Sequence, residues 1–277
     1  MGLAHWTNAE ARTGCTVMVL PEGSVASGEI RGSAPATREF GLLDPLASVQ
    51  SVDAIVLSGG SAFGLSAADG VVGELEAAGR GFPTAFGPVP IVVGMSLFDL
   101  GVGASDVRPG PAEGASTARA ALAGEVHELV GLLGAGTGAT SGKWGGPTTA
   151  GAAGLGFDLI EMGEIWVAAL VAVNAFGFVG SSLPHDVSEP WKPAIGENTT
   201  IGVLLSNATL EKPTCHHLAR AGHDGYAKSI FPAHTAADGD AVVAVATAST
   251  GAVAHPMQMR AAAELAMARA VLSTASN

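Results

Sequence analysis

Charged side chains are scarce in this chain. Only 14% of its 277 residues are Asp, Glu, Lys or Arg, whereas 48% are hydrophobic. So few charges on a compact chain suggest that subunits cover much of the surface, and we expect a homo-oligomer. The 25 acidic residues outnumber the 13 basic ones and give a net charge of −12. This acidity argues against nucleic acid or an anionic membrane as a partner.

Cysteine is nearly absent, because the chain has only Cys15 and Cys215. Two cysteines so far apart make neither a disulfide framework nor a metal-type spacing, so we expect free thiols in a reducing compartment. The first twelve residues lack the apolar segment of a signal peptide, and no run approaches the ~18–20 apolar residues of a membrane span. We therefore expect a cytoplasmic protein.

No pattern in the sequence predicts a metal or a cofactor. His216 and His217 are adjacent on an expected helix and face different directions, which makes a shared metal site improbable. The Gly-rich stretches match neither the P-loop nor the full dinucleotide-binding pattern.

The apolar segments alternate between strand-like and helix-like patterns. We expect strands at residues 15–20, 25–31, 52–57, within 89–100, and at 151–157, 165–173, 200–206 and 241–247. We expect helices at residues 65–78, 112–133, 211–229 and 256–272. The first two strands are expected to pair as a hairpin, and so are the strands at 151–157 and 165–173. This order predicts one α+β domain over residues 1–277, a layered αββα sandwich, with no strong internal repeat.

Thr199 lies where a turn-rich segment meets a core strand. Residues 181–196 contain three prolines and are expected to form an exposed loop, whereas the residues after Thr200 are apolar and β-prone. A loop can be cut at this point while the strand anchors the new terminus, which suits an N-terminal nucleophile. Thr-Thr-Ile is also an ordinary strand opening, and the residues alone leave both interpretations open.

The chemistry of such a terminus needs only one residue. The Thr199 hydroxyl attacks the Asn198 carbonyl, an N→O acyl shift forms an ester, and water hydrolyses it. The freed α-amino group titrates near ~7.7–8.0, so it accepts a proton at neutral pH where a lysine amine at ~10.4 mostly does not.

A Gly-rich turn and a polar loop could each serve a site or only the fold. The turn with Gly59, Gly60 and Ser61 joins a strand to a helix and could bind an anion or oxyanion, or could simply allow tight packing. Arg31 and Arg38 could hold a carboxylate, or could be ordinary surface arginines that pair with Glu39.

Lys143, Asn174 and the pair Asp238 and Asp240 also allow two interpretations. Lys143 is the single cation of a glycine-rich stretch and could steady negative charge, or lie on a loose loop. Asn174 ends an apolar strand, where it could be either an oxyanion donor or a turn former. Asp238-Gly239-Asp240 is either a hairpin turn or a source of carboxylates that orient the nucleophile.

Seven motifs, in order and spread over nearly the whole chain, resemble those of the DmpA-type peptidases. This is the L-aminopeptidase/D-esterase group, which also includes nylon-oligomer hydrolase. The motifs are the stretches at residues 31–39, 58–65, 89–92, 141–143, 173–174, 198–201 and 238–240.

The resemblance implies an αββα fold shared with the ornithine acetyltransferase group and self-cleavage into subunits of residues 1–198 and 199–277. It implies hydrolysis of small peptide, amide or ester substrates near a free amino terminus, by a tetramer of cleaved protomers. By motif matching, Thr199 is the nucleophile, Lys143 and Asn174 assist it and hold the oxyanion, and Asp238 and Asp240 orient it.

One position departs from the family pattern. Family members commonly place a Tyr where this chain has Phe98, and the only Tyr here is Tyr226. A missing oxyanion donor can cost ~2.7–4 kcal/mol, which bears on the rate and substrate range. Two alternatives stay open: an acyltransferase like the ornithine acetyltransferases, and an unprocessed homologue that serves as a binding or structural oligomer.

Overall fold

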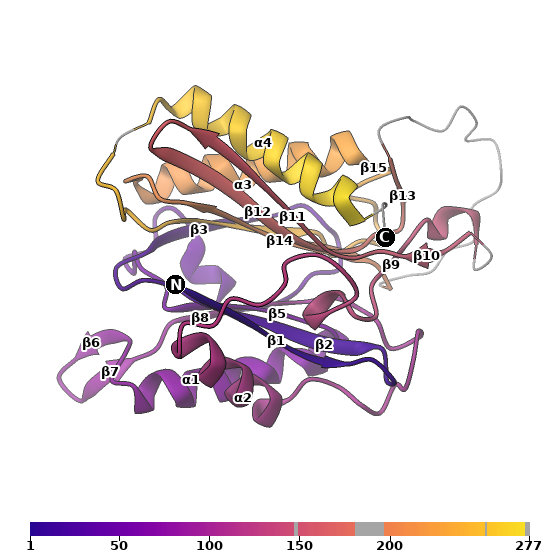
Figure 1. Cartoon of the computed structure of the whole chain (residues 1–277), viewed down its shortest axis with the longest axis horizontal. Helices are drawn as coiled ribbons and strands as arrows, with labels where there is room; N and C mark the ends of the chain where they lie inside the picture. The colour runs from indigo at the N-terminus through magenta and orange to yellow at the C-terminus, as the bar shows by residue number, and fades with distance from the viewer. Residues whose placement is uncertain (147–148, 181–196, 253, 275–277) are drawn as a thin grey trace.

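Helices cover both outer faces of two stacked sheets in a computed structural model of the chain (Figure 1). The structure describes residues 1–146, 149–180, 197–252 and 254–274. The expected loop at residues 181–196 lies outside this part of the chain. Within it, no helix combines the length and apolar character needed to cross a membrane.

The first sheet has the strand order β1-β2-β5-β8-β4. Its strands are β1 (Gly2–Asn8), β2 (Thr13–Val19), β5 (Ala54–Ser58), β8 (Val92–Ser96) and β4 (Ala36–Arg38). Only β5 and β8 run parallel, because α1 (Ala67–Ala77) carries the chain from one to the other. Helix α2 (Pro111–Leu122) packs beside α1 on the outer face.

The second sheet has the order β11-β12-β14-β16-β3. Its strands are β11 (Gly154–Met162), β12 (Ile165–Asn174), β14 (Thr199–Ser206), β16 (Ala241–Ala246) and β3 (Val25–Ile30). Here β14 and β16 are the parallel pair, joined through α3 (Lys212–Ser229). Helix α4 (Pro256–Ser273) packs against α3. Three two-stranded ribbons complete the fold: β6 (Phe82–Thr84) with β7 (Gly87–Val89), β9 (Thr140–Ser141) with β10 (Gly151–Ala152), and β13 (Phe178–Val179) with β15 (Ile230–Phe231).

The central strands are buried on both faces, which explains their unbroken apolar sequences. In β14, Val203 and Leu205 point into the core between the sheets, whereas Leu204 points toward α3 and α4. In β16, Val243 and Val242 divide in the same way. This alternation follows from the two-residue period of a strand. A strand so enclosed holds its first residue, Thr199 in β14, in a fixed place.

The two halves of the fold share one plan, although the sequence shows no strong repeat. Each half runs through two antiparallel strands, a third strand, a helix, a parallel strand and a second helix. Strands β3 and β4 are consecutive in the chain but close the edges of opposite sheets. This exchange ties the halves together, and the layers agree with the αββα fold class predicted from the sequence.

Two expectations about individual elements were wrong. The strands at 15–20 and 25–31 do not form a hairpin, because β1 and β5 occupy both edges of β2 and β3 pairs with β16 instead. The helix expected over 112–133 ends at Leu122, where Gly124 adopts a φ of +83° that a helix cannot continue.

Candidate active site

Thr199 opens β14 in the middle of the second sheet. The register sets it opposite Asn174 at the end of β12, and a bridge pairs Asn198 with Asp238 ahead of β16. Both residues of the Asn198–Thr199 bond are buried. The ends of three neighbouring strands therefore bring together the residues that the sequence singled out.

The peptide bond between Asn198 and Thr199 lies against the threonine's own hydroxyl. Thr199 Oγ1 donates to the carbonyl oxygen of Asn198 at 2.5 Å. The backbone N–H of Gly239 donates to the same oxygen at 2.9 Å. A backbone donor fixed on a carbonyl oxygen is the arrangement that stabilises negative charge developing there.

Gly239 can approach this closely because it has no side chain. A Cβ at this position would lie 2.8 Å from Thr199 Oγ1 and 2.5 Å from the carbonyl oxygen of Ala34. The loop after β3 also fixes residues 238–240. Ala34 N donates to Asp238 O at 3.0 Å, and Gly32 N donates to Asp240 O at 3.1 Å. The spacing Asp-Gly-Asp thus sets a glycine beside the nucleophile with a carboxylate on either side.

Asn174 and Lys143 hold the carbonyl group of Glu197, the residue before Asn198. Asn174 Nδ2 donates to the carbonyl oxygens of Phe98 at 2.7 Å and Glu197 at 3.3 Å. Lys143 Nζ donates to Asn174 Oδ1 at 2.7 Å, to Asn174 O at 3.3 Å and to Glu197 O at 3.4 Å. All three Nζ contacts are acceptors, which suits an ammonium group with its three donors.

Burial lowers the pKa of Lys143 to about 8, against the opposing attraction of Asp238 and Glu197. The side chain of Lys143 is therefore mostly an ammonium at neutral pH. It loses its proton as the pH rises through about 8, within the pH range of ordinary enzyme assays. A cation in contact with Asn174 and Glu197 can stabilise negative charge that forms beside them.

The two aspartates have different partners. Asp240 accepts the backbone N–H of Thr200 at 2.8 Å through Oδ1, and the N–H and Nδ1 of His234 at 3.1 and 2.8 Å through Oδ2. Asp238 accepts from Thr235 and from the backbone N–H of Phe176. Burial, and then the nearby charge of Asp240, raise the pKa of Asp238 despite those hydrogen bonds. The hairpin-turn interpretation of Asp238–Asp240 does not hold, because β16 pairs with β14 and β3.

The amides of Gly59, Gly60 and Ser61 are used within the fold. They donate to Gly14 O, Asp99 Oδ1 and Leu97 O respectively. A Cβ on Gly59 would lie 2.0 Å from Asp99 Oδ2, so the glycine is needed for packing. The turn is linked to the site only indirectly. It bonds Leu97 and Asp99, which flank Phe98, and the carbonyl oxygen of Phe98 accepts from Asn174.

The two arginines have acidic partners in their own chain. Arg31 bonds Asp224 at 3.0 Å, and Arg38 pairs with Asp69. His234 was not among the site residues predicted from the sequence, although it lies six residues before Asp240. Asp99 was not predicted either, and it is buried and accepts from Thr13 Oγ1 at 2.7 Å.

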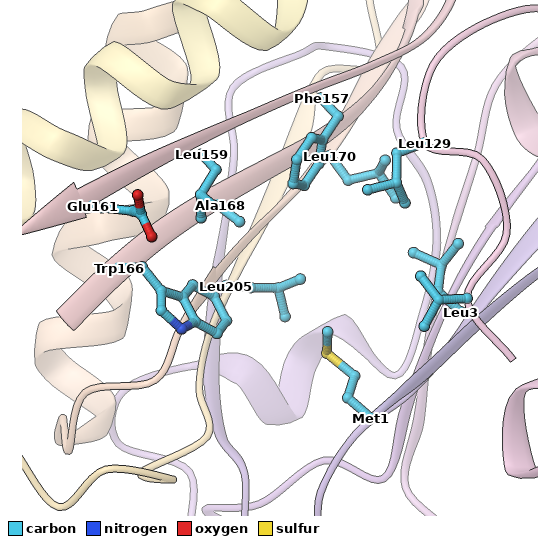
Figure 2. A pocket seen from close by; sticks show the side chains of 11 residues that line it. Met1, Leu3, Leu129, Phe157, Leu159, Glu161, Trp166, Ala168, Leu170 and Leu205 are labelled. Atoms are coloured by element: carbon cyan, nitrogen blue, oxygen red, sulfur yellow. The ribbon is translucent and has the colours of Figure 1, made fainter. Parts of the chain in front are cut away.

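A hollow of about 340 Å³ opens between the sheets at the other end of β14 (Figure 2). Leu205 lines it, six residues along the strand from Thr199, which corresponds to roughly 20 Å of extended chain. Its lining is almost wholly apolar, with side chains such as Leu3, Phe157 and Trp166, and Glu161 at the edge. The hollow reaches the surface, because Met1, Val126 and Leu159 in its lining are exposed, and it is remote from Thr199.

Comparison with known proteins identifies the family, since residues 1–276 match Peptidase family S58. The chain belongs to peptidase family S58. It is a hydrolase of the peptidase or amidase type, as the resemblance of its motifs predicted. In the described part of this S58 chain, no group of three or more His, Cys, Asp or Glu side chains is placed to hold a metal ion.

Relatives and solved structures agree with this family. The chain is 38% identical to an uncharacterized aminopeptidase of Mycobacterium leprae, over 94% of this chain and 81% of the relative. It is 28% identical to a 6-aminohexanoate-oligomer endohydrolase of an Agromyces species, over 89% of this chain and 72% of the relative. The structure of an L-aminopeptidase D-Ala-esterase/amidase from Ochrobactrum anthropi, a variant of the Ntn hydrolase fold, aligns with a TM-score of 0.72 and 16% identity over 99% of this chain and 83% of that one. This likeness shows that the S58 chain has the same α+β fold.

Proposed function

We propose that this S58 chain is an N-terminal-threonine amidohydrolase that cuts itself between Asn198 and Thr199 into subunits of residues 1–198 and 199–277. The observation that carries the proposal is the contact of Thr199 Oγ1 with the carbonyl group of Asn198, whose oxygen is also held by Gly239 N. Nucleophile, target and oxyanion donor thus meet in one buried place.

Self-cleavage follows from this geometry in two steps. Thr199 Oγ1 loses its proton and bonds the carbonyl carbon of Asn198, the C–N bond breaks, and the Thr199 nitrogen gains a proton to become an amine. Water then hydrolyses the resulting ester, which leaves a carboxylate on Asn198 and restores the hydroxyl. Gly239 N stabilises the oxyanion, and the Lys143 ammonium lowers the energy of negative charge nearby.

Cutting would also open the substrate site. In the intact chain, the carbonyl oxygen of Glu197 takes up donors from Asn174 and Lys143. Departure of the residues before Thr199 frees those donors for the acyl group of a substrate, while Asp240 keeps hold of Thr200 N. The free α-amine of Thr199 serves as the base for its own hydroxyl, through an acyl-enzyme intermediate.

The substrates we propose are amides or esters of small peptides or related oligomers that carry a free amino group. The aminopeptidase names of the mycobacterial relatives and the oligomer hydrolase of Agromyces support this class. The acyltransferase alternative would be favoured by a deep pocket with a second amine site beside Thr199.

Denaturing mass spectrometry and amino-terminal sequencing test the proposal. The wild-type chain should give two fragments, the smaller beginning with Thr199, and should hydrolyse chromogenic amides of unprotected amino acids. Thr199→Ala should give one uncut chain without activity. Thr200→Val is the matched control, because the buried Thr200 Oγ1 has no hydrogen-bond partner among the described residues. A stable, uncut wild-type chain would contradict self-cleavage and favour a non-catalytic homologue.

A further inference from the structure

The environment of His234 contains acceptors at both ring nitrogens. Its Nδ1 lies 2.8 Å from Asp240 Oδ2, and its Nε2 lies 3.2 Å from the carbonyl oxygen of His223. A neutral imidazole has only one N–H and can satisfy one of these acceptors. Only the imidazolium, with two N–H groups, donates to both. The geometry therefore selects the charged form of His234.

This histidine is held in an unusual backbone conformation. Its φ is +57°, in the left-handed region that non-glycine residues seldom adopt. The same conformation lets the backbone N–H of His234 donate to Asp240 Oδ2 at 3.1 Å, beside the ring's own bond. Two donors of one residue thus converge on one carboxylate oxygen. Backbone strain that serves a specific contact is common where residues support a reaction.

Asp240 passes this restraint on to the nucleophile. Its second oxygen, Oδ1, accepts the N–H of Thr200 at 2.8 Å. Thr200 follows Thr199 directly, so the carboxylate fixes the peptide on the far side of the residue that reacts. The side chain of Asp240 is 2% exposed, so a charge on it needs a buried partner. The imidazolium of His234 provides one.

We propose that His234, as an imidazolium, is a positioning residue that keeps Asp240 charged and oriented so that Asp240 holds Thr199 in its reactive place. This inference rests on the proposed function. Among the described residues, the hydrogen bonds of His234 go to Asp240 and His223 and not to Thr199 or the scissile carbonyl, so it acts through Asp240.

The surroundings support a charged His234. Burial opposes the charge, but the hydrogen bond and the negative charge of Asp240, with the carbonyl of His223, raise the pKa of His234 above its ordinary value in spite of Arg31. Burial lowers the pKa of the His223 side chain to about 4, so that ring is neutral. Tyr226, on the same helix, is neutral because burial raises its pKa.

Kinetics of His234→Asn test the role in catalysis. Asparagine tolerates a positive φ and keeps a short donor, but it carries no charge. We expect kcat and the self-cleavage rate to fall about 10- to 100-fold, with KM nearly unchanged, as for the loss of a charge-assisted hydrogen bond. The wild-type advantage should be largest below the raised pKa of His234 and should shrink as pH rises through it, because the wild type then loses the same charge.

His216→Asn is the matched control. His216 lies on α3, with Nδ1 3.1 Å from Gly28 O and Nε2 3.4 Å from Glu29 Oε2, so it also faces a carbonyl and a carboxylate. Within the described residues, its hydrogen-bond and ion-pair partners are Gly28 and Glu29 and not Asp240. Equal losses in the His216→Asn and His234→Asn variants, or an unchanged rate and pH profile in His234→Asn, would overturn the assignment.

Nitrogen-15 NMR of the histidine rings decides the charge without any substitution at His234. In the uncut Thr199→Ala chain at pH 6, below the ordinary histidine pKa, both ring nitrogens of His234 should carry protons, and Asp240→Asn should lower the pH at which one is lost. A singly protonated His234 would overturn the proposal, even if His234→Asn fails to fold. If the wild-type chain does not cut itself, the proposed function fails, while this titration still reports on His234.

Discussion

Among single residues, Lys143 gives the clearest pH dependence. Its ammonium form has three acceptors around it, and burial lowers its pKa to about 8. Because the cation is present below that pH and lost above it, self-cleavage should slow as pH rises through about 8. Self-cleavage is the suitable reaction, since no free α-amine yet titrates in the same range.

Lys143→Arg separates charge from proton transfer. Arginine stays charged at any assay pH, so the alkaline fall in rate should disappear, although its planar fork fits the three acceptors less well and lowers the maximum. Lys143→Met should slow cleavage by roughly 10²–10³-fold at all pH values. Freshly translated chains, followed on denaturing gels, give these rates. A rate that increases through pH 8 and is lost in the arginine variant would instead make Lys143 a base.

The missing side chain of Gly239 gives a second prediction, which concerns the added Cβ of an alanine. A methyl group here would meet Thr199 Oγ1 at 2.8 Å and Ala34 O at 2.5 Å, so one of them must move. Displacing the nucleophile by about 1 Å can cost 10²-fold in rate, and we expect a loss of at least that size in Gly239→Ala. Time courses of self-cleavage measure it. Gly73→Ala, where a Cβ has nothing within 4 Å, should cut at the wild-type rate.

Individual elements show where sequence patterns succeed. The hairpin of β11 and β12, the apolar β14 and β16, and helices α3 and α4 were all predicted near their observed places, because each is a continuous segment whose own residues indicate its type. The proximity of Lys143 to Asn174 was implied only by the family resemblance. No local pattern could bring together residues 31 positions apart.

The missed elements depend on distant contacts. Strand β1 was not expected because its seven residues, including His5 and Thr7, are not strongly apolar, and only its pairing with β2 makes it a strand. The partner of β3 was misassigned, because a sequence indicates a strand without indicating which edge is open. His234 was missed because its importance depends on the positive φ and on Asp240.

The end of α2 gives a prediction at this scale. Gly124 follows the helix at a φ of +83°, which is costly for any other residue. Gly124→Ala should lower the free energy of unfolding by about 1–2 kcal/mol. Gly73→Ala, in the exposed part of α1, should raise it by about 0.5–1 kcal/mol. Urea unfolding of both in the uncut Thr199→Ala background measures the pair. Changes of the same sign in the free energy of unfolding of the two variants would contradict the role given to Gly124.

On the scale of the whole molecule, the proposed cut would divide one sheet between two chains. Residues 199–277 provide β14 and β16 at its centre, with helices α3 and α4 on its outer face. Residues 1–198 provide β11 and β12 on one side and β3 on the other. Strand β14 pairs with β12 along eight residues, and β16 pairs with β3 along six. Neither subunit can therefore leave without breaking ladders on both sides of the sheet.

We therefore expect the two subunits to stay together after cleavage and to separate only when the fold is lost. Native gel filtration should give one peak that contains both fragments, at the volume of uncut Thr199→Ala, and the mass of that peak also tests the predicted association of copies. In urea, the fragments should dissociate as they unfold, because each exposes the apolar faces of an incomplete sheet. Separate native peaks for residues 1–198 and 199–277 would mean that the shared sheet does not hold the cut molecule together. Such a result would also remove the anchored strand on which an N-terminal Thr199 depends.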